Sequence, residues 1–433
     1  MVGLGKLGCT MMACFAHRGW DVIGTDINPE YVLSVNEGKS PIYEPGVAGL
    51  LKAHKEKISA TSDPVEAALK SDVSFIIVPT PTVEDGSFTT KYVFEAAKGV
   101  APAIKKKSSY HLVVVTSTVM PGETDKVRQL IEDISEKRCG PDFGVVYNPD
   151  FIALGSVIEN FLNPDMILIG ESDEKAGKII EDIHRALVLN EPETHRMNFW
   201  NAELAKIGLN SYCTLKITFA NIIGEICERL PGGDAHAVTQ AIGADSRVGK
   251  KYFKPGLGYS GPCFPRDQRA FSHAARSAGV RAILSEATDL INDYQKNGRT
   301  SEKVIENLKK GFDKISILGL TYKENTTLVE ESPSLSLIKN LDAGGFKISV
   351  YDPAGMEEAQ KELSDCKNVT YHSSAIDCIK DACLCFVATP WGEFRNLTED
   401  DFKTNMMDPV VIDAWNLYSF KEITCKKIGK SDV

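Results

Sequence analysis

The stretch Gly3-Leu4-Gly5-Lys6-Leu7-Gly8, at the start of the chain, decides the class of fold. Its glycines follow the spacing GxGxxG, and the helix-like segment 9–17 comes directly after it. Such glycines allow a tight turn and a close backbone approach to a pyrophosphate, which the N-terminus of the next helix attracts. Asp26 ends the following apolar run, at the distance where a carboxylate meets the ribose of an adenosine. The pattern predicts a dinucleotide site for NAD rather than NADP, because a carboxylate there repels a 2′-phosphate.

Only Met1 and Val2 precede this glycine turn. In a doubly wound sheet the turn follows a complete strand, and that strand is central. A missing central strand would leave buried backbone groups of its neighbours unpaired. We therefore expect the chain as given to begin inside its first strand, which would be truncated.

Outward from the turn, short apolar runs alternate with helix-like stretches up to about residue 195, and the alternation returns near the C-terminus. The early runs are residues 21–25, 73–78, 112–116, 143–147 and 166–169, and the late runs are 314–319, 347–351, 383–388 and 410–413. Strands that alternate with helices predict βαβ units and a mainly parallel sheet. No internal sequence repeat is visible.

The middle of the chain has a helical pattern. Apolar residues recur at helical spacing over residues 201–228, without a proline to stop the helix, and a second helical segment runs from about Ala282 to Lys310. A loop rich in glycine and proline, residues 255–265, separates them. The tail, residues 426–433, is expected to be disordered. The predicted fold is α/β, with two Rossmann-like doubly wound parallel-sheet domains (1–198 and 301–433) joined by a helical central domain (199–300).

Bulk properties exclude several classes of protein. The chain has 433 residues and a formal charge of −10, which argues against a nucleic-acid partner. Its apolar runs are too short to cross a bilayer, and no signal peptide is recognisable before the first motif. The 11 cysteines are irregularly spaced, without a CxxC pair, so neither a disulfide framework nor a zinc site is indicated. Most are expected to be buried in a reducing compartment, and we predict a cytoplasmic protein.

The chemistry is predicted by the stretch Gly256-Leu257-Gly258-Tyr259-Ser260-Gly261-Pro262-Cys263-Phe264-Pro265-Arg266-Asp267. Its glycines let the backbone approach a ligand, and Cys263 can act as a nucleophile. Asp267 follows the cysteine by about one helical turn. On the long helix, Lys206 and Asn210 are spaced i,i+4 and share one face. Such a pair could hold an oxyanion or a reacting water, although a solvated helix face has the same spacing.

Motifs along the whole chain carry a family resemblance. They are GLGKLG (3–8), SPIYEPG (40–46), VPTPT (78–82), STVMPGET (117–124), NPDF (148–151), AELAKIGLNSY (202–212), DSRVG (245–249), GLGYSGPCFPRD (256–267), GLTYKENT (319–326), YDP (351–353) and IDAWN (412–416). With these motifs the chain resembles the UDP-glucose/GDP-mannose dehydrogenase family from end to end. Several of the motifs are long, specific and in the family's order.

The resemblance implies a four-electron oxidation of a nucleotide sugar at C6, with UDP-glucose favoured and two NAD molecules used in succession. Cys263 would capture the intermediate aldehyde as a thiohemiacetal, which becomes a thioester that water releases as the uronic acid. Lys206 and Asn210 would stabilise the oxyanion, while Asp267, Thr118 and Asp150 resemble residues that position water and handle protons. No metal is required.

The resemblance also implies ligand contacts. Those for NAD are Gly3, Leu4, Gly5, Lys6, Leu7, Gly8, Asp26, Pro79, Thr80, Pro81, Ser117, Thr118 and Val119. Those for the sugar nucleotide are Asp150, Phe151, Ile152, Ala153, Leu154, Lys206, Asn210, Arg247, Gly256, Gly258, Gly261 and Lys323. Arg247 resembles an arginine that reaches the neighbouring subunit's site, so a homodimer built through the central domain is implied.

Several positions depart from the family's pattern. Asp150 replaces a glutamate, Ala153-Leu154 replaces Arg-Glu, Arg266 replaces a lysine, and Glu330 and Trp415 each replace an arginine. The departures leave other readings open: the same chemistry on another UDP- or GDP-hexose, or a catalytically silent protein that binds NAD or a UDP-sugar. A two-electron dehydrogenase is a further alternative, but it would not need Cys263. The retained catalytic set favours an active enzyme.

Overall fold

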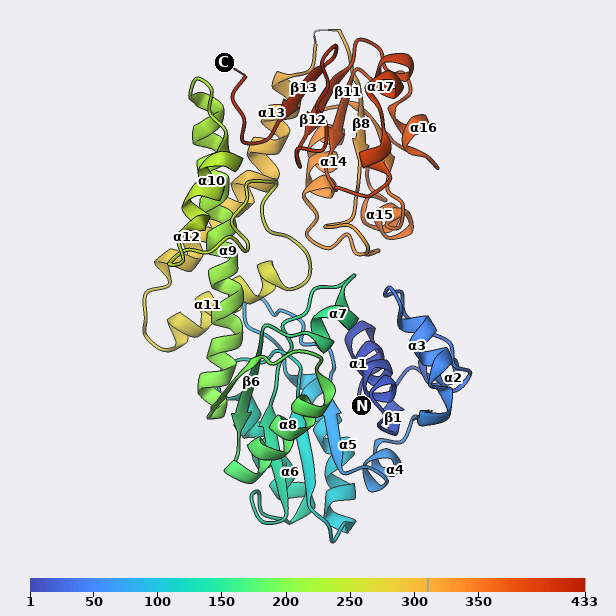
Figure 1. Ribbon diagram of the computed structural model, residues 1–433, viewed down its shortest axis with the longest axis vertical. Coiled ribbons are helices and arrows are strands. Elements are labelled where there is room, and N and C mark those ends of the chain that lie inside the picture. Colours follow the sequence, from blue (N-terminus) through green and yellow to red (C-terminus); the bar gives the residue numbers. More distant parts are fainter. Residues whose placement is uncertain (310, 433) are drawn as a thin grey trace. The chain divides into compact units, whose positions relative to one another are not determined.

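The computed structural model describes residues 1–309 and 311–432 (Figure 1). Contacts between Cα atoms divide the chain into two compact units. Unit 1 comprises Met1–Gly208 and His273–Gly279, and unit 2 comprises Leu209–Ser272 and Val280–Val433. The three-domain boundaries stay a prediction. Lys310 and Val433, where a predicted helix and the predicted tail end, lie outside the described residues.

Unit 1 contains a mainly parallel sheet, as expected. Its strands run in the order β2-β1, then Val2, then β3-β4-β5-β6-β7, and the β5–β6 pair alone is antiparallel among the described strands. The strands are β1 (Val22–Thr25), β2 (Ile58–Thr61), β3 (Val73–Ile76), β4 (His111–Val115), β5 (Phe143–Tyr147), β6 (Met166–Glu171) and β7 (Glu193–Met197). Val2 holds the central position: it bridges Thr25 of β1 and Ile76 of β3, and its backbone N–H donates to the Phe75 carbonyl at 2.7 Å. The backbone groups of both neighbours are therefore paired beside it.

Helices cover both faces of this sheet. They are α1 (Lys6–His17), α2 (Pro29–Asn36), α3 (Val47–Ala53), α4 (Pro64–Leu69), α5 (Lys91–Lys106), α6 (Glu123–Ser135), α7 (Val157–Leu162) and α8 (Glu174–Leu187). Leu112 and Val114 of β4 pack into a core with residues of α1, α3, α7 and α8, while Val113 and Val115 pack into a second core with α5 and α6. A strand buried on both faces must be apolar at every position, which explains the continuous apolar runs in the sequence.

Unit 2 contains a six-stranded, fully parallel sheet in the order β10-β9-β8-β11-β12-β13. Its strands are β8 (Lys314–Leu318), β9 (Lys347–Tyr351), β10 (Val369–Tyr371), β11 (Leu384–Val387), β12 (Val410–Asp413) and β13 (Thr424–Lys427). Numbered along the chain, this is the order 3-2-1-4-5-6 of a doubly wound sheet. The predicted Rossmann-like fold is confirmed.

The other helices of the chain surround this sheet or form the helical middle. They are α9 (Phe199–Arg229), which begins in unit 1 and continues into unit 2, α10 (Ala235–Ala244), α11 (Phe264–Ser277), α12 (Ile283–Asp293), a π-helical segment (Tyr294–Arg299), α13 (Thr300–Glu306), α14 (Pro333–Ala343), α15 (Met356–Glu362), α16 (Ala375–Ile379) and α17 (Glu399–Asn405). The two predicted helical segments match α9 and the run from α12 to α13. No helix in the described part of the chain is long and apolar enough to cross a membrane.

The prediction of a disordered tail is wrong for residues 426–432. Strand β13 pairs in parallel with β12, so Lys426 and Lys427 belong to the sheet. Beyond it, the Gly429 N–H donates to the Glu228 carboxylate at 2.7 Å, and the Ser431 N–H donates to the Gly233 carbonyl at 2.9 Å. Backbone pairing with a sheet edge and with the end of α9 orders a segment that lacks an apolar pattern of its own.

Candidate active site

The glycine turn in unit 1 has the geometry of a nucleotide cradle. Gly3 has φ of +101°, and a Cβ on it would lie 2.1 Å from the Ile77 carbonyl oxygen, while a Cβ on Gly8 would lie 2.0 Å from the Gly3 oxygen. A Cβ on Gly5 would meet nothing within 4 Å. Gly5 is the N-cap of α1, which has no acidic residue in its first turn and no side-chain cap. Gly3 and Gly8 are thus required by packing, and Gly5 leaves the helix N-terminus open to a phosphate.

Asp26 lies beside this turn, as predicted. Its Oδ2 accepts from the Leu4 N–H at 2.7 Å and its Oδ1 accepts from the Asn28 N–H at 2.8 Å. The residue is half-buried, and a carboxylate has room for further hydrogen bonds beyond these two. The turn and Asp26 together fit the pyrophosphate and adenosine ribose of NAD.

The two other predicted cofactor segments, 78–82 and 117–119, are fastened to each other. The Ser117 hydroxyl donates to the Val78 carbonyl at 2.7 Å and accepts from the Val78 N–H at 2.9 Å. The Thr80 hydroxyl donates to the Thr118 carbonyl at 2.8 Å. Val119 is buried, whereas Pro79 and Pro81 are exposed. These hydrogen bonds hold both segments at the carboxyl ends of β3 and β4, where doubly wound sheets bind their ligands.

Lys206 is held against the loop that follows β5. It is 7% exposed, which excludes a solvated helix face. Its Nζ donates to the main-chain carbonyl of Asp150 at 2.5 Å and lies 4.4 Å from the centre of the Phe151 ring. The next residues of the loop are half-buried or exposed, namely Ile152, Ala153 and Leu154. The structure thus brings together Lys206 and the predicted sugar-binding segment 150–154.

The Asp150 carboxyl is suited to proton transfer. Burial raises its pKa to about 7, and the positive charge of Lys206 acts against that rise. Its Oδ2 is buried without a hydrogen-bond partner among the described residues. A carboxyl with a pKa near neutrality can take and return a proton at ordinary pH.

In unit 2 the predicted nucleophile is accessible. All 11 cysteines lie within the described residues, and Cys263 alone is exposed, while seven are buried. The Asp267 N–H donates to the Cys263 carbonyl at 2.8 Å, so the carboxylate stands one helical turn after the thiol. Two glycines shape the preceding loop: a Cβ on Gly258 would lie 2.5 Å from the Asn292 Oδ1, and one on Gly261 would lie 2.6 Å from the Tyr322 ring.

Asp267 is the centre of a polar cluster beside that thiol. It is 0% exposed, and its Oδ2 accepts from the Asn210 Nδ2 at 2.5 Å. Arg266 forms an ion pair with Oδ1 at 2.9 Å. Burial opposes the charge of Arg266, but Asp267 and the neighbouring Cys263 hold the arginine's pKa above its usual value. Asp267, in the first turn of α11, is therefore held on one oxygen by Asn210 and on the other by Arg266.

The remaining predicted sugar-binding residues are spread over unit 2. Arg247 has an 87% exposed side chain and pairs with Asp245 at 2.7 Å. Lys323 places its Nζ 5.8 Å from the centre of the Tyr322 ring. The Gly256 N–H donates to the Asn221 Oδ1 at 2.7 Å.

Two of the residues that depart from the family pattern also lie near the cysteine loop. The main-chain carbonyl of Glu330 accepts from the Gly261 N–H at 3.2 Å, and burial raises the pKa of its carboxyl, with Arg266 acting in the opposite direction. The Trp415 indole N–H donates to the Ala388 carbonyl at 2.8 Å, and its ring lies 3.5 Å from the place where a Cβ on Gly256 would be.

Sequence reasoning missed the polar residues that hold these loops. The amide of Asn292 accepts from the Tyr259 N–H at 2.7 Å and donates to the Tyr259 carbonyl at 3.0 Å. Glu44, in the SPIYEPG motif, accepts from Gly155 and Val157. Glu203, in the AELAKIGLNSY motif, is fully buried, and burial raises its pKa to about 7. For Glu44 and Glu203 the available signal was a charged side chain with no assigned role inside a family motif, whereas Asn292 lies in none of the motifs.

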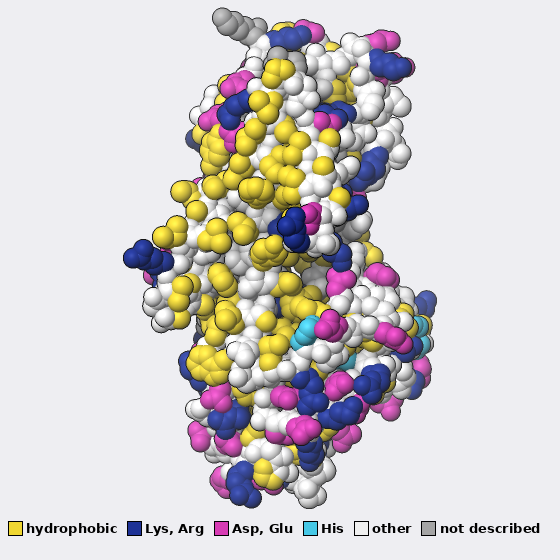
Figure 2. Space-filling view, turned by 60° about the vertical axis from the view of Figure 1, so that its left-hand side comes forward, with side chains coloured by type: hydrophobic (Ala, Val, Ile, Leu, Met, Phe, Trp, Pro, Cys, Tyr) yellow, Lys and Arg dark blue, Asp and Glu magenta, His cyan; other side chains and the backbone are white. Residues whose placement is uncertain are grey.

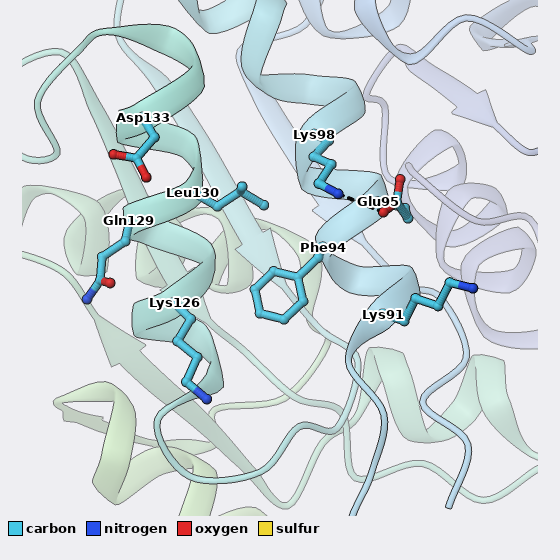
Figure 3. A pocket seen from close by; sticks show the side chains of 8 residues that line it. All are labelled: Lys91, Phe94, Glu95, Lys98, Lys126, Gln129, Leu130 and Asp133. Atoms are coloured by element: carbon cyan, nitrogen blue, oxygen red, sulfur yellow. Dashed lines mark hydrogen bonds and ion pairs between the residues drawn. The ribbon is translucent and has the colours of Figure 1, made fainter. Parts of the chain in front are cut away.

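A separate surface groove lies between α5 and α6, with a volume of about 410 Å³ (Figure 3). Its lining residues are Lys91, Phe94, Glu95, Lys98, Lys126, Gln129, Leu130 and Asp133. None of these is a predicted site residue, so we assign the groove no part in the chemistry. Among residues 1–309 and 311–432, no cluster of three or more His, Cys, Asp or Glu side chains could hold a metal ion.

A doubly wound sheet with an open GxGxxG turn and a carboxylate beside that turn is typical of an NAD-dependent enzyme. The comparisons specify the family. The models for the UDP-glucose/GDP-mannose dehydrogenase family match residues 1–188 (NAD binding domain), 200–294 (central domain) and 316–420 (UDP binding domain). The chain belongs to the UDP-glucose/GDP-mannose dehydrogenase family. It is an NAD-dependent oxidoreductase of nucleotide sugars.

Individual relatives agree with this assignment. The chain is 34% identical to the UDP-glucose 6-dehydrogenase of Haloferax volcanii over 430 residues, covering 98% of this chain and 97% of the relative. It is 34% identical to the GDP-mannose 6-dehydrogenase of Pseudomonas aeruginosa over 382 residues, covering 84% of each. The structure of a UDP-glucose dehydrogenase from Pyrobaculum islandicum superposes with a TM-score of 0.89 at 33% identity, covering 99% of this chain and 96% of that one.

Proposed function

We propose that this enzyme oxidises the C6 hydroxyl of a UDP-hexose to the carboxylate through a thioester on Cys263. UDP-glucose is the favoured substrate. The observation that carries the proposal is the single exposed thiol, placed one helical turn before a buried Asp267–Asn210 pair. Relatives named for UDP-glucose and the match to a UDP binding domain support the substrate.

The overall reaction fixes what the residues must do. One alcohol, two NAD⁺ and one water give one carboxylate, two NADH and three protons. NAD, when bound at the Gly3–Gly8 turn and Asp26, supplies the acceptor for the two hydrides. A dehydrogenase that stopped at the aldehyde would need no nucleophile, so the accessible Cys263 favours the four-electron reaction.

The proposed steps use the two polar clusters. The C6 alcohol first loses a hydride and a proton and becomes an aldehyde. The Cys263 thiol adds to the aldehyde carbon, and the resulting thiohemiacetal loses a second hydride and its hydroxyl proton to become a thioester. Lys206 carries a fixed positive charge that stabilises the negative oxygen formed at C6. Asn210 orients this oxygen or the attacking water, while Asp267 fixes the amide. Water then attacks the thioester carbon, and as the carbon–sulfur bond breaks the sulfur regains a proton and the acid leaves as the carboxylate. Asp150, assisted by Thr118, accepts one proton at a time and passes it to solvent.

We propose that the protein is a homodimer in which Arg247 of one subunit reaches the active site of the other. Large hydrophobic side chains on α9, α10 and α12 are exposed in this chain, and Figure 2 shows hydrophobic side chains gathered on the corresponding face. They include Tyr212, Phe219, Ile226, Val238, Ile283, Leu284 and Leu290. The free cysteines support a reducing compartment, the cytoplasm.

The test of the reaction is NADH formation with limiting sugar, over a panel of UDP- and GDP-hexoses, for the wild type and Cys263→Ala. We expect two NADH per sugar with UDP-glucose, and loss of product in the variant. One NADH per sugar would establish a two-electron dehydrogenase instead. Preference for GDP-mannose would make GDP-mannose the assigned substrate. NAD binding without turnover of any sugar would establish a catalytically silent binding protein.

The dimer is tested by complementation. Arg247→Ala and Cys263→Ala proteins are mixed, unfolded and refolded together. If Arg247 serves the partner's site, a mixed dimer contains one site with both residues intact and regains activity. A monomer by light scattering, or no recovery in the mixture, would contradict the proposed arrangement.

A further inference from the structure

Glu203 is a buried carboxyl that the proposed mechanism does not use. It lies on α9 one turn before Lys206 and is 0% exposed. Its Oε2 accepts from the Gly122 N–H at 2.5 Å, and its Oε1 accepts from the Thr124 N–H at 2.8 Å. Burying a carboxyl is costly unless it has such partners, so this contact is a specific feature of the fold.

The partners of Glu203 begin helix α6. The first N–H groups of a helix have no acceptor inside the helix, and a carboxylate there is also favoured by the helix dipole. Gly122 has φ of +94°, and a Cβ on it would lie 2.4 Å from the Trp200 ring. Trp200 and Glu203, which lie one turn apart on α9, therefore both contact the tight turn at Gly122 and hold α9 against it.

Both joined elements carry proposed reaction residues. The turn at Gly122 continues from the cofactor segment 117–119, whose Thr118 carbonyl is bonded to Thr80. On the other side, Lys206 follows Glu203 by three residues and donates to the Asp150 carbonyl. The hydrogen bonds of Glu203 thus connect the cofactor segment to the amine within unit 1.

We propose that Glu203 is a positioning residue that sets the place of Lys206 relative to the cofactor segment 117–119. This inference rests on the function proposed above. Both carboxyl oxygens are needed, because each accepts from a different N–H group. Glutamine keeps the length but turns an N–H₂ toward one donor, and alanine leaves both donors buried without an acceptor.

The test compares Glu203→Ala, Glu203→Gln and the control Glu132→Gln. Glu132, on α6 itself, accepts from the Cys139 N–H at 2.9 Å and from Arg128 at 2.5 Å, and neither partner is a proposed site residue. We expect kcat of Glu203→Ala to fall by about 30-fold, because small misplacements in an active site cost up to about 10²-fold. KM for the sugar and the Kd of NADH should change less than about threefold. Glu203→Gln should recover part of kcat, and the control should keep it.

A second measurement needs no turnover. Amide hydrogen exchange of the NAD-free protein should be faster in Glu203→Ala at residues 119–126 and at residues 148–156, because both loops are anchored through this part of α9. Faster exchange at 119–126 alone, or a folded Glu203→Ala protein with wild-type kcat, would overturn the positioning role. If the wild type oxidises no nucleotide sugar, the proposed reaction fails, while the exchange experiment still decides the link between the loops.

Discussion

The two sheets contain the same turn, with different surroundings. In unit 1, Gly3 has φ of +101° and the Leu4 N–H donates to the Oδ2 of Asp26 at 2.7 Å. In unit 2, Gly319 has φ of +96° and the Leu320 N–H donates to the Oδ2 of Asp352 at 2.7 Å. In both units the glycine follows the first segment of the sheet along the chain (Val2 in unit 1, β8 in unit 2), and the aspartate follows the next strand (β1 and β9).

The difference lies in the other donors. Asp26 accepts one more backbone hydrogen bond and is half-buried. Asp352 is 1% exposed, and its oxygens accept from the N–H groups of Leu320, Thr321, Ala354 and Gly355, the Thr321 hydroxyl and the Trp391 indole. The carboxylate of Asp26 therefore keeps acceptor capacity for a ligand, whereas that of Asp352 is part of the core and its capacity is used by the protein.

Removing the carboxylate of Asp352, whose acceptor capacity is fully used within the protein, should have the largest effect on stability. We expect Asp352→Ala to lower the free energy of unfolding of unit 2 by about 4 kcal/mol, because several buried N–H groups lose their acceptor together. The Kd of NADH, set in unit 1, should stay within about threefold of the wild type. Urea unfolding and NADH fluorescence titration measure the two quantities. A small stability loss would show that water replaces the carboxylate.

Asp150, whose buried Oδ2 has no hydrogen-bond partner among the described residues, should make the protein less stable as the pH rises. Burial raises the pKa of Asp150 from 3.8 to about 7, so the folded state binds a proton that the unfolded state has released. The stabilisation is complete below about pH 4 and is lost as pH rises through about 7, about 4 kcal/mol in all, because one pKa unit corresponds to about 1.4 kcal/mol. Asp150→Asn should remove this contribution and leave that of Glu203, whose pKa burial also raises to about 7. Urea unfolding between pH 4 and pH 8 measures it, and an unchanged slope in the variant would assign the proton elsewhere.

Removing the half-buried carboxylate of Asp26 should change the affinity for NADH more than the free energy of unfolding. We expect Asp26→Ala to weaken NADH binding by about 30-fold, on the order of 2 kcal/mol, and to narrow the preference for NADH over NADPH. Its unfolding free energy should fall by about 1 kcal/mol, because the freed N–H groups can reach water. Stability losses as large as those of Asp352→Ala would contradict the contrast between the two turns.

The smallest effect should come from Gly5, the one glycine of the GxGxxG turn with open space around it. Gly5→Ala adds a Cβ that meets no protein atom within 4 Å, so stability should change by less than about 0.5 kcal/mol. NADH binding should weaken about tenfold, because the methyl group enters the path of the pyrophosphate. Gly8→Ala is the matched comparison, since its Cβ would lie 2.0 Å from the Gly3 oxygen and should impair folding. Equal NADH affinity in Gly5→Ala and wild type would place the phosphates elsewhere.

Much of the fold could be predicted because strands buried on both faces are apolar throughout. The edge strand β13 (Thr424–Lys427) was missed because its sequence, TCKK, has no such run. The repeated turn at Gly319 was also invisible. Thr321 and Tyr322 follow it where glycine and a helix start follow in unit 1, so the repeat is in topology and hydrogen bonding.

The candidate site could be predicted where it is local in sequence. The one-turn spacing from Cys263 to Asp267 and the face shared by Lys206 and Asn210 needed only helix geometry. The contact of Lys206 with the Asp150 carbonyl, and that of Glu203 with Gly122, join segments more than 50 residues apart. Such pairings depend on tertiary packing, which a single sequence does not specify.

The distribution of thiols has a practical consequence for assays. With seven cysteines buried and three half-buried, a native sample should consume a small alkylating reagent first at Cys263. With limiting reagent a native chain should take up one label, on the proposed nucleophile, whereas a misfolded chain exposes further thiols and takes up more. The number of singly labelled chains therefore counts native sites, independent of total protein. Specific activities of variants can be normalised to that count, which separates damaged chemistry from a smaller folded fraction.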